Sequence, residues 1–446
     1  MSRPLSLILV LLVVVVACNG SADPSTTSSG DGAPSTTVTT IAGETTTTSG
    51  GDVTTTTAAA PPVTEPDLSG LEGVSDEVRA QLENLIRVAQ EIRELPFLDP
   101  PTITIVSDDE LEALVREDIQ EEAEDFPADE SLYKMLGLLN EAADFEEIVL
   151  DLYGEQVAGY YDGDTGEIVV PAREDGFSLL QRGTLVHELV HAITDQHFGF
   201  NDTFQAMIDE DRLDQATAYQ ALIEGDATLA EVLWVQTLTQ GEVGEFLAES
   251  LGIDTASLDA APRFLTESLI FPYDSGLSFT QDLYIGTGGW TEVNDAYSVM
   301  PGLPASTEQV ITPDDYTRDL PVEVSSPSVT VSGYELERTS VWGEQGFRIM
   351  LNQGEGTQSV AAAADGWGGD SYQQWFDGEN AALLITYVGD TQGDVDELED
   401  ALLKFATQDF PEEKFVWVEQ LDGTLYFIAA DETPIGESIR AAVGLD

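Results

Sequence analysis

Basic residues are scarce in this sequence. Only 16 of its 446 residues are Lys or Arg, against 84 Asp and Glu, which gives a formal net charge of −68. Phosphate backbones and anionic lipid surfaces repel a chain this acidic, so the composition argues against nucleic-acid binding and polybasic membrane recognition. Hydrophobic residues make up 42% of the chain, which is enough for one large core and a second, smaller one. Disorder of the whole chain is therefore not expected.

Cysteine is nearly absent, since Cys18 is the only one, and no internal disulfide can form. Cys18 follows an apolar run over residues 5–17, which at about 13 residues is shorter than a membrane-spanning helix but typical of a secretory signal. The string Val-Val-Ala-Cys at 15–18 is similar to the bacterial lipobox, in which the cysteine is acylated. We therefore expect residues 1–17 to be a lipoprotein signal peptide and Cys18 to be the lipidation site. The alternative is an ordinary signal peptide with an incidental cysteine.

Long hydrophobic runs are missing after this signal, so a lipid anchor on the extracytoplasmic face of a bacterial membrane is the expected location, in the cell envelope. Residues 18–70 are rich in Thr, Ser, Gly and Pro and lack the apolar side chains that offset ordering entropy. They are expected to be a disordered tether. Folded structure is expected from Leu71 onward, in one domain over residues 71–325 and a smaller one over residues 330–446.

Hydrophobic periodicity predicts helices and strands in both parts. Between residues 71 and 325 the pattern predicts a helix around Val78–Ala89, a strand at 102–106, helices at 108–122, 129–140 and 144–153, a hairpin of 157–162 with 167–170, and helices at 178–197 and 213–236. After residue 330 it predicts helices at 344–351 and 359–364, a strand at 382–388, a helix at 395–407, strands at 414–420 and 424–429, and a short final helix. The string at 366–370, Gly-Trp-Gly-Gly-Asp, is interpreted as a tight turn. Together these elements predict an α+β protein.

The predicted helix at 178–197 carries a chemical motif, His187-Glu188-Leu189-Val190-His191. Four residues advance a helix by about 400°, so both imidazoles lie on one face and can reach one metal ion. Glu188 lies near the same face and can act on a water at that ion without being a ligand. This pattern predicts a hydrolytic zinc site. The flanking residues are apolar, which indicates that the helix is buried.

The third metal ligand has two candidates. His197 stands at the spacing of the metzincin pattern, but on a continuous helix it lies about 240° round and roughly 9 Å beyond His191. Metzincins break the helix with a glycine, where this chain has Thr194, a β-branched residue that resists positive φ. The competing candidate is Glu224, on the predicted helix at 213–236. A carboxylate from a second helix gives the two-His, one-Glu site of gluzincins. We favour Glu224 and keep His197 as the alternative.

These strings together resemble a known group of proteins. Residues 184–198, then Glu-Gly-Asp-Ala-Thr at 224–228, then Pro-Ala-Ser-Thr-Glu-Gln at 304–309 look like bacterial zinc metallopeptidases of gluzincin type. The string at 366–370 also looks like part of that group. The resemblance implies a mostly helical zincin-like metallopeptidase domain with a short β-hairpin or sheet, followed by the smaller C-terminal α+β domain.

The resemblance also implies residue roles, with His187, His191 and Glu224 as zinc ligands and Glu188 as general base. The sequence departs from the thermolysin type at Thr228, where those enzymes place an acid. Asp226 is the candidate to take over that supporting role.

Those enzymes also stabilise the oxyanion with a distal histidine, and this chain has no histidine besides His197 to spare. A tyrosine or arginine is expected to replace it, with four unranked tyrosine candidates: Tyr160, Tyr161, Tyr219 and Tyr273.

The resulting hypothesis is a lipid-anchored extracytoplasmic zinc metallopeptidase. It would cleave peptide or protein substrates with a water that zinc polarises and Glu188 deprotonates. In zincin-like folds an edge strand beside the active-site helix pairs with an extended substrate, and by analogy the hairpin at 157–170 is placed to supply it. Two alternatives remain: a catalytically inactive zinc-containing binding or scaffold lipoprotein, and a solute-binding lipoprotein.

Overall fold

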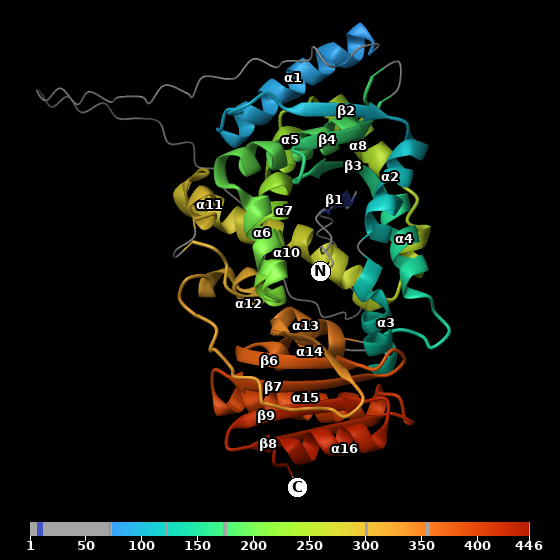
Figure 1. Cartoon of the computed structure of the whole chain (residues 1–446). Helices are drawn as coiled ribbons and strands as arrows, with labels where there is room; N and C mark the ends of the chain where they lie inside the picture. The colour runs from blue at the N-terminus through green and yellow to red at the C-terminus, as the bar shows by residue number, and fades with distance from the viewer. Residues whose placement is uncertain are drawn as a thin grey trace, which may run out of the picture.

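The computed structural model describes residues 7–11, 71, 74–121, 123–172, 176–298, 302–352 and 357–445 (Figure 1). Cys18 and the predicted tether up to residue 70 lie outside the described residues, as does the predicted signal peptide apart from Leu7–Leu11. The fold is α+β, as the sequence predicts. No helix in the described ranges is long and apolar enough to cross a membrane.

Helices make up most of the structure. They are α1 (Asp76–Arg93), α2 (Asp108–Glu121), α3 (Phe126–Met135), α4 (Phe145–Gln156), α5 (Leu179–Phe198), α6 (Phe200–Asp209), α7 (Leu213–Val235), α8 (Gln240–Ser250), α9 (Ala256–Ala260), α10 (Arg263–Thr287), α11 (Thr291–Ala296), α12 (Thr307–Ile311), α13 (Gly343–Leu351), α14 (Thr357–Ala364), α15 (Gln392–Gln408) and α16 (Thr433–Ala442), with short 3-10 helices η1 (Ala123–Asp125) and η2 (Pro313–Asp315). Several begin where the sequence predicts, because capping side chains fix their first turns. Ser75 caps α1, Asp144 caps α4, and Ser178 forms a capping box with Gln181 at the start of α5.

The first sheet contains the predicted hairpin. Strands β3 (Val157–Asp162) and β4 (Glu167–Pro171) pair antiparallel, and β2 (Thr102–Val106) runs parallel to β4. Strand β1 (Leu7–Leu11) pairs antiparallel with the other edge of β3, which gives the order β1-β3-β4-β2. In Figure 1 this sheet lies beneath α1 and beside α5.

Helices α5, α7 and α10 form the centre of the main core. Most of the buried apolar residues of α5 and α7, and Phe271, Phe279 and Leu283 of α10, belong to one cluster that also includes the inner face of α1. Helices α7 and α10 approach closely through Gly225 and Gly276. A Cβ atom added at Gly225 would lie 2.1 Å from the carbonyl oxygen of Gly276, so only glycine fits there.

The C-terminal sheet has the order β5-β6-β7-β9-β8. Its strands are β5 (Glu335–Ser340), β6 (Trp367–Phe376), β7 (Ala381–Gly389), β8 (Phe415–Leu421) and β9 (Thr424–Ala430). One face packs against α13 and α15 and shares its core with α3, and the other packs against α16. The sheet forms the base of the molecule in Figure 1.

Strand β6 of this sheet differs from the sequence-based interpretation. The tight turn predicted at 366–370 is limited to Gly366, which has φ +77°. The chain enters β6 at Trp367, and Asp370 lies within that strand. Its carboxylate accepts hydrogen bonds from the backbone amides of Trp342 and Gly343 and from the indole of Trp367. Asp370 therefore links the start of α13 to the sheet.

Candidate metal centre

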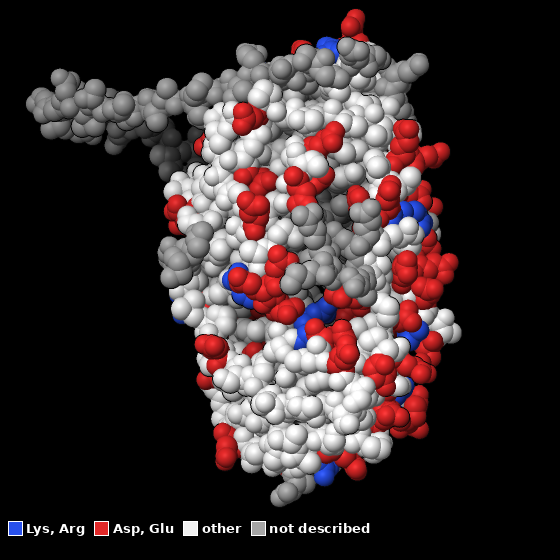
Figure 2. Space-filling model, viewed as in Figure 1, with Lys and Arg blue, Asp and Glu red and all other residues white. Residues whose placement is uncertain are grey.

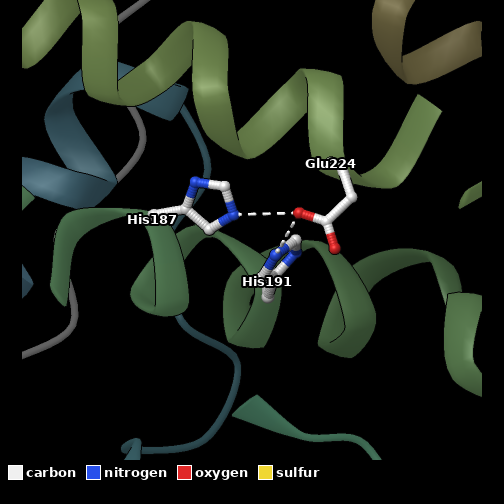
Figure 3. A group of neighbouring side chains, drawn as sticks. All are labelled: His187, His191 and Glu224. Carbon is white, nitrogen blue, oxygen red and sulfur yellow. Dashed lines mark hydrogen bonds and ion pairs between the residues drawn. The ribbon is translucent and has the colours of Figure 1, made fainter. Parts of the chain in front are cut away.

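Helices α5 and α7 bring three predicted ligands together (Figure 3). His187 Nε2 lies 3.1 Å and His191 Nε2 lies 3.4 Å from Oε2 of Glu224. The two histidines are one turn apart on α5, and the glutamate faces them from α7. Donor atoms at zinc bond lengths in a tetrahedral site lie roughly 3.4 Å apart. The observed separations therefore fit one zinc ion.

The three side chains are fully buried, with His187 1% exposed and His191 and Glu224 0% exposed. Within the described ranges, Nδ1 of His191 and Oε1 of Glu224 make no hydrogen bond. A buried polar atom without a partner costs about 1–3 kcal/mol. A cation held by two imidazoles and a carboxylate removes part of this cost, and the donor set is one that zinc prefers. The residues present thus fit the predicted metal.

Glu188 lies beside these ligands and is also 0% exposed. Burial raises the pKa of Glu188 to about 8, and the nearby Glu224 contributes in the same direction, while His187 and the Tyr161 backbone oppose it. Tyr161 belongs to β3, so Glu188 lies close to that strand as well as to the candidate ligands. The pKa of His191 is lowered by burial, which favours the neutral form that binds metal.

A second glutamate of α7 also faces this site. Oε2 of Glu231 lies 3.8 Å from Nδ1 of His187, on the side of the ring away from Glu224. Sequence reasoning missed Glu231. The signal was available, since a residue seven positions after Glu224 lies on the same face of a helix. Glu231, and neither Thr228 nor Asp226, is therefore the acidic neighbour of His187 on this part of α7.

Asp226 instead faces α1. Its Oδ1 lies 2.8 Å from Nε of Arg93, and its Oδ2 accepts hydrogen bonds from Arg93 and from the hydroxyl of Tyr297. Arg93 also donates to Asn294 and lies over the ring of Trp290. No hydrogen bond or ion pair among the described residues joins Asp226 to a predicted ligand. Asp226 therefore holds α7 in place against α1 and the end of α11.

His197, the alternative third ligand, is directed away from the other two histidines. Helix α5 continues unbroken through Thr194 and ends at Phe198. Nε2 of His197 lies 2.8 Å from the carbonyl oxygen of Pro96, in the connection between α1 and β2. The group of possible ligands around His187 and His191 contains Glu224 and not His197.

The four tyrosine candidates are now distinguishable. The ring centroid of Tyr273, on α10, lies 6.3 Å from that of His187. The Tyr161 hydroxyl donates to Asp195, and Tyr219 packs against Tyr297. Burial and the charge of Asp118 raise the pKa of Tyr160. Tyr273 is therefore the candidate whose ring lies beside a predicted ligand, His187.

Tyr273 also lines a cavity of about 460 Å³. Apolar and aromatic side chains from α4, α6, α10 and α13 form most of its wall, among them Phe204, Phe264 and Trp342. Gln220, one turn before Glu224 on α7, contributes a polar group. His187, Glu188, His191 and Glu224 do not line this cavity, and Tyr273 and Gln220 are the lining residues that lie nearest to them.

Comparison with known proteins gives one match. Residues 330–439 match the model of a protein family described as a domain of unknown function (DUF8575). The match covers most of the C-terminal sheet and its helices, and it does not include the histidines of α5. No curated protein and no solved structure matches the chain.

Proposed function

We propose that this protein is a lipid-anchored, extracytoplasmic zinc metallopeptidase. The observation that carries the proposal is the convergence of His187, His191 and Glu224 on one point, with Glu188 beside them. A zinc ion held by these three side chains would polarise a substrate carbonyl and lower the pKa of a water molecule.

Glu188 is the proposed general base. Its position on α5, next to His187 and close to β3, would let it take a proton from the attacking water and pass it to the departing amine. Glu231 supports the site by holding the orientation of the His187 ring.

The proposed binding site for an extended substrate is the edge of strand β3. In the structure β1 pairs with this edge, with Leu7 opposite Asp162 and Ile8 opposite Tyr161. This pairing supports the proposal, since it places an extended backbone beside the strand next to Glu188. A peptide substrate would use the same backbone hydrogen bonds, while the neighbouring cavity receives its side chains. The edge becomes available once residues 1–17 are removed as a signal peptide.

Acylation of Cys18 would anchor the mature chain. Its sequence position directly after the apolar run supports this assignment. About 50 polar residues between Cys18 and the folded part would then allow the site to reach substrates some tens of ångströms from the bilayer.

Cleavage of a peptide library by the purified protein tests the proposal. We expect the wild type to cut, a chelator to abolish cutting, and added zinc to restore it. Glu188→Gln should keep its zinc and lose cutting, while Glu83→Gln, on the exposed face of α1, should behave as the wild type. Zinc binding without any cleavage by the wild type would instead favour a binding or scaffold lipoprotein.

A further inference from the structure

A second group of oxygen ligands meets where the C-terminal sheet joins the rest of the molecule. Glu308 comes from α12, Asp319 from the segment after η2, and Asp390 from the turn between β7 and α15. One carboxylate oxygen of each lies within 4.8 Å of the others. Three segments that are distant in the sequence therefore direct negative charge at one point.

Glu308 is the unusual member of this group. It is 4% exposed, and its carboxylate makes no hydrogen bond or ion pair with any described residue. Further acids, Glu344 and Asp315, add to the negative potential around it, so that burial and these charges raise the pKa of Glu308 to about 9. In Glu344, Oε1 pairs with Arg348, while Oε2 is buried and makes no hydrogen bond. A buried carboxylate in this setting requires either a proton or a cation.

No Lys or Arg among the described residues forms an ion pair with Glu308, Asp319 or Asp390. Asp319 is half-buried and Asp390 is exposed, so an ion from solvent can reach the buried Glu308 oxygens.

The backbone around the group is held firmly. The amide of Asp390 donates to the carbonyl of Gly366, that of Val322 donates to Gly368, and the Gln309 side chain donates to the carbonyl of Asp319. These bonds hold the three backbone segments next to one another, and the bond from Gln309 links the segment of Glu308 directly to that of Asp319.

We propose that Glu308, Asp319 and Asp390 bind a calcium ion. Calcium takes oxygen ligands at about 2.3–2.6 Å, so oxygens bound to one ion can lie up to about 5 Å apart, whereas magnesium at about 2.1 Å demands a tighter set. Separations within 4.8 Å are compatible with three oxygen ligands of one calcium ion. The remaining positions are open to water on the side of Asp390. The site has no imidazole donor and is thus distinct in chemistry from the one formed by His187 and His191.

The bound ion would join α12 to the C-terminal sheet. This assigns a role to the string at 304–309, whose residues Ser306 to Gln309 are all buried at that junction. Thr307 bonds Asp214 of α7, Glu308 holds the ion, and Gln309 bonds the segment of Asp319.

Calcium titration of the zinc-loaded, calcium-free protein tests the proposal, by calorimetry and by the thermal unfolding midpoint. We expect one calcium ion per chain and, at about ten times the dissociation constant, a rise in midpoint of at least about 2 °C. Glu308→Gln and the exposed variant Asp390→Asn should both lose this response. Asp314→Asn, an exposed neighbour outside the group, should keep it.

The proposal is overturned if the wild type binds no calcium at millimolar concentration, or if folded Glu308→Gln binds it as well as the wild type. A third outcome would show that Glu308 carries a proton in place of a cation. In that case the thermal unfolding midpoint of the wild type does not change with calcium, and calcium-free Glu308→Gln unfolds at a higher temperature than the calcium-free wild type. A larger midpoint rise with magnesium than with calcium would overturn the choice of ion. Circular dichroism of each variant confirms that it is folded.

Discussion

Arg93 and Asp226 form a fully buried ion pair, with Nε of the arginine 2.8 Å from Oδ1 of the aspartate and both side chains 0% exposed. Asp226 is two residues after the candidate ligand Glu224. The pair therefore joins the last turn of α1 to the part of α7 that presents the carboxylate to the histidines.

Replacing Arg93 should destabilise the protein strongly. Arg93→Met leaves the Asp226 carboxylate buried without its cation, which costs about 3–5 kcal/mol in the free energy of unfolding. Denaturant unfolding measures this loss. Arg87→Met is the matched control, since Arg87 is exposed on α1 and its ion pair with Glu91 is worth at most about 1 kcal/mol. Equal losses of unfolding free energy in both variants would show that the buried pair stabilises the protein no more than the exposed pair does.

Zinc content should separate the two candidates for third ligand. Glu224→Ala removes a carboxylate that lies 3.1 Å from His187, so we expect zinc to be lost on dialysis. His197→Ala should retain one zinc per chain, because its ring bonds the backbone of Pro96. Elemental analysis of both dialysed variants gives the answer. Loss of zinc from His197→Ala alone would reverse the assignment.

Glu231 should affect metal affinity without being a ligand. Glu231→Gln weakens the contact that orients His187, and loss of such a supporting group typically lowers metal affinity by about 10–100-fold. Competition with a zinc chelator measures the change. Glu245→Gln, exposed on α8, is the control and should bind as the wild type does. An affinity unchanged in Glu231→Gln would mean that the 3.8 Å contact is incidental.

Tyr273 should contribute to turnover and not to metal binding. If its hydroxyl stabilises the oxyanion, Tyr273→Phe lowers kcat by about 10²-fold while KM and zinc content stay close to the wild type. The control is Tyr284→Phe on the same helix, whose ring packs against Trp290. Steady-state kinetics on a cleaved library peptide separates kcat from KM. Full activity in Tyr273→Phe would remove this tyrosine from the mechanism.

The titration of Asp214 should make the folded protein less stable as the pH rises. Burial raises the pKa of Asp214 to about 7, although hydrogen bonds from Thr307 act to lower it. Between pH 4 and about 7 the folded state then holds a proton that the unfolded state releases, so the free energy of unfolding falls by up to about 1.4 kcal/mol per pH unit from this group. In Asp214→Asn that contribution should vanish. Unfolding midpoints from pH 4.5 to 7.5 compare the two chains, and parallel curves would contradict the prediction.

Local sequence patterns predicted the elements around the site. The spacing of His187 and His191 within one turn, the cap at Ser178 and the two short strand-like runs joined by the turn at 163–166 are properties of neighbouring residues. The structure contains the corresponding α5, β3 and β4. The position of Glu224 relative to the histidines depends on how α7 packs against α5. No local sequence pattern contains that information.

Other elements were missed for identifiable reasons. Helix α10 includes Pro272 and Gly276, residues that usually indicate a break, and tertiary packing overrides both. Strand β6 begins with glycines and buries polar side chains such as Gln374, which donates to the carbonyl of Ala128. A buried strand with polar residues satisfied by distant partners carries little alternation in its sequence.

The contact of Gly225 with Gly276 makes the crossing of α7 and α10 a fixed pivot. Where two backbones already touch, the helices cannot approach further, and any separation there would open a void next to Glu224. A relative rotation of the two helices would therefore pivot at this contact and displace the helix ends most. Glu224 is the residue next to Gly225, so the carboxylate that faces the histidines stands where the two backbones touch.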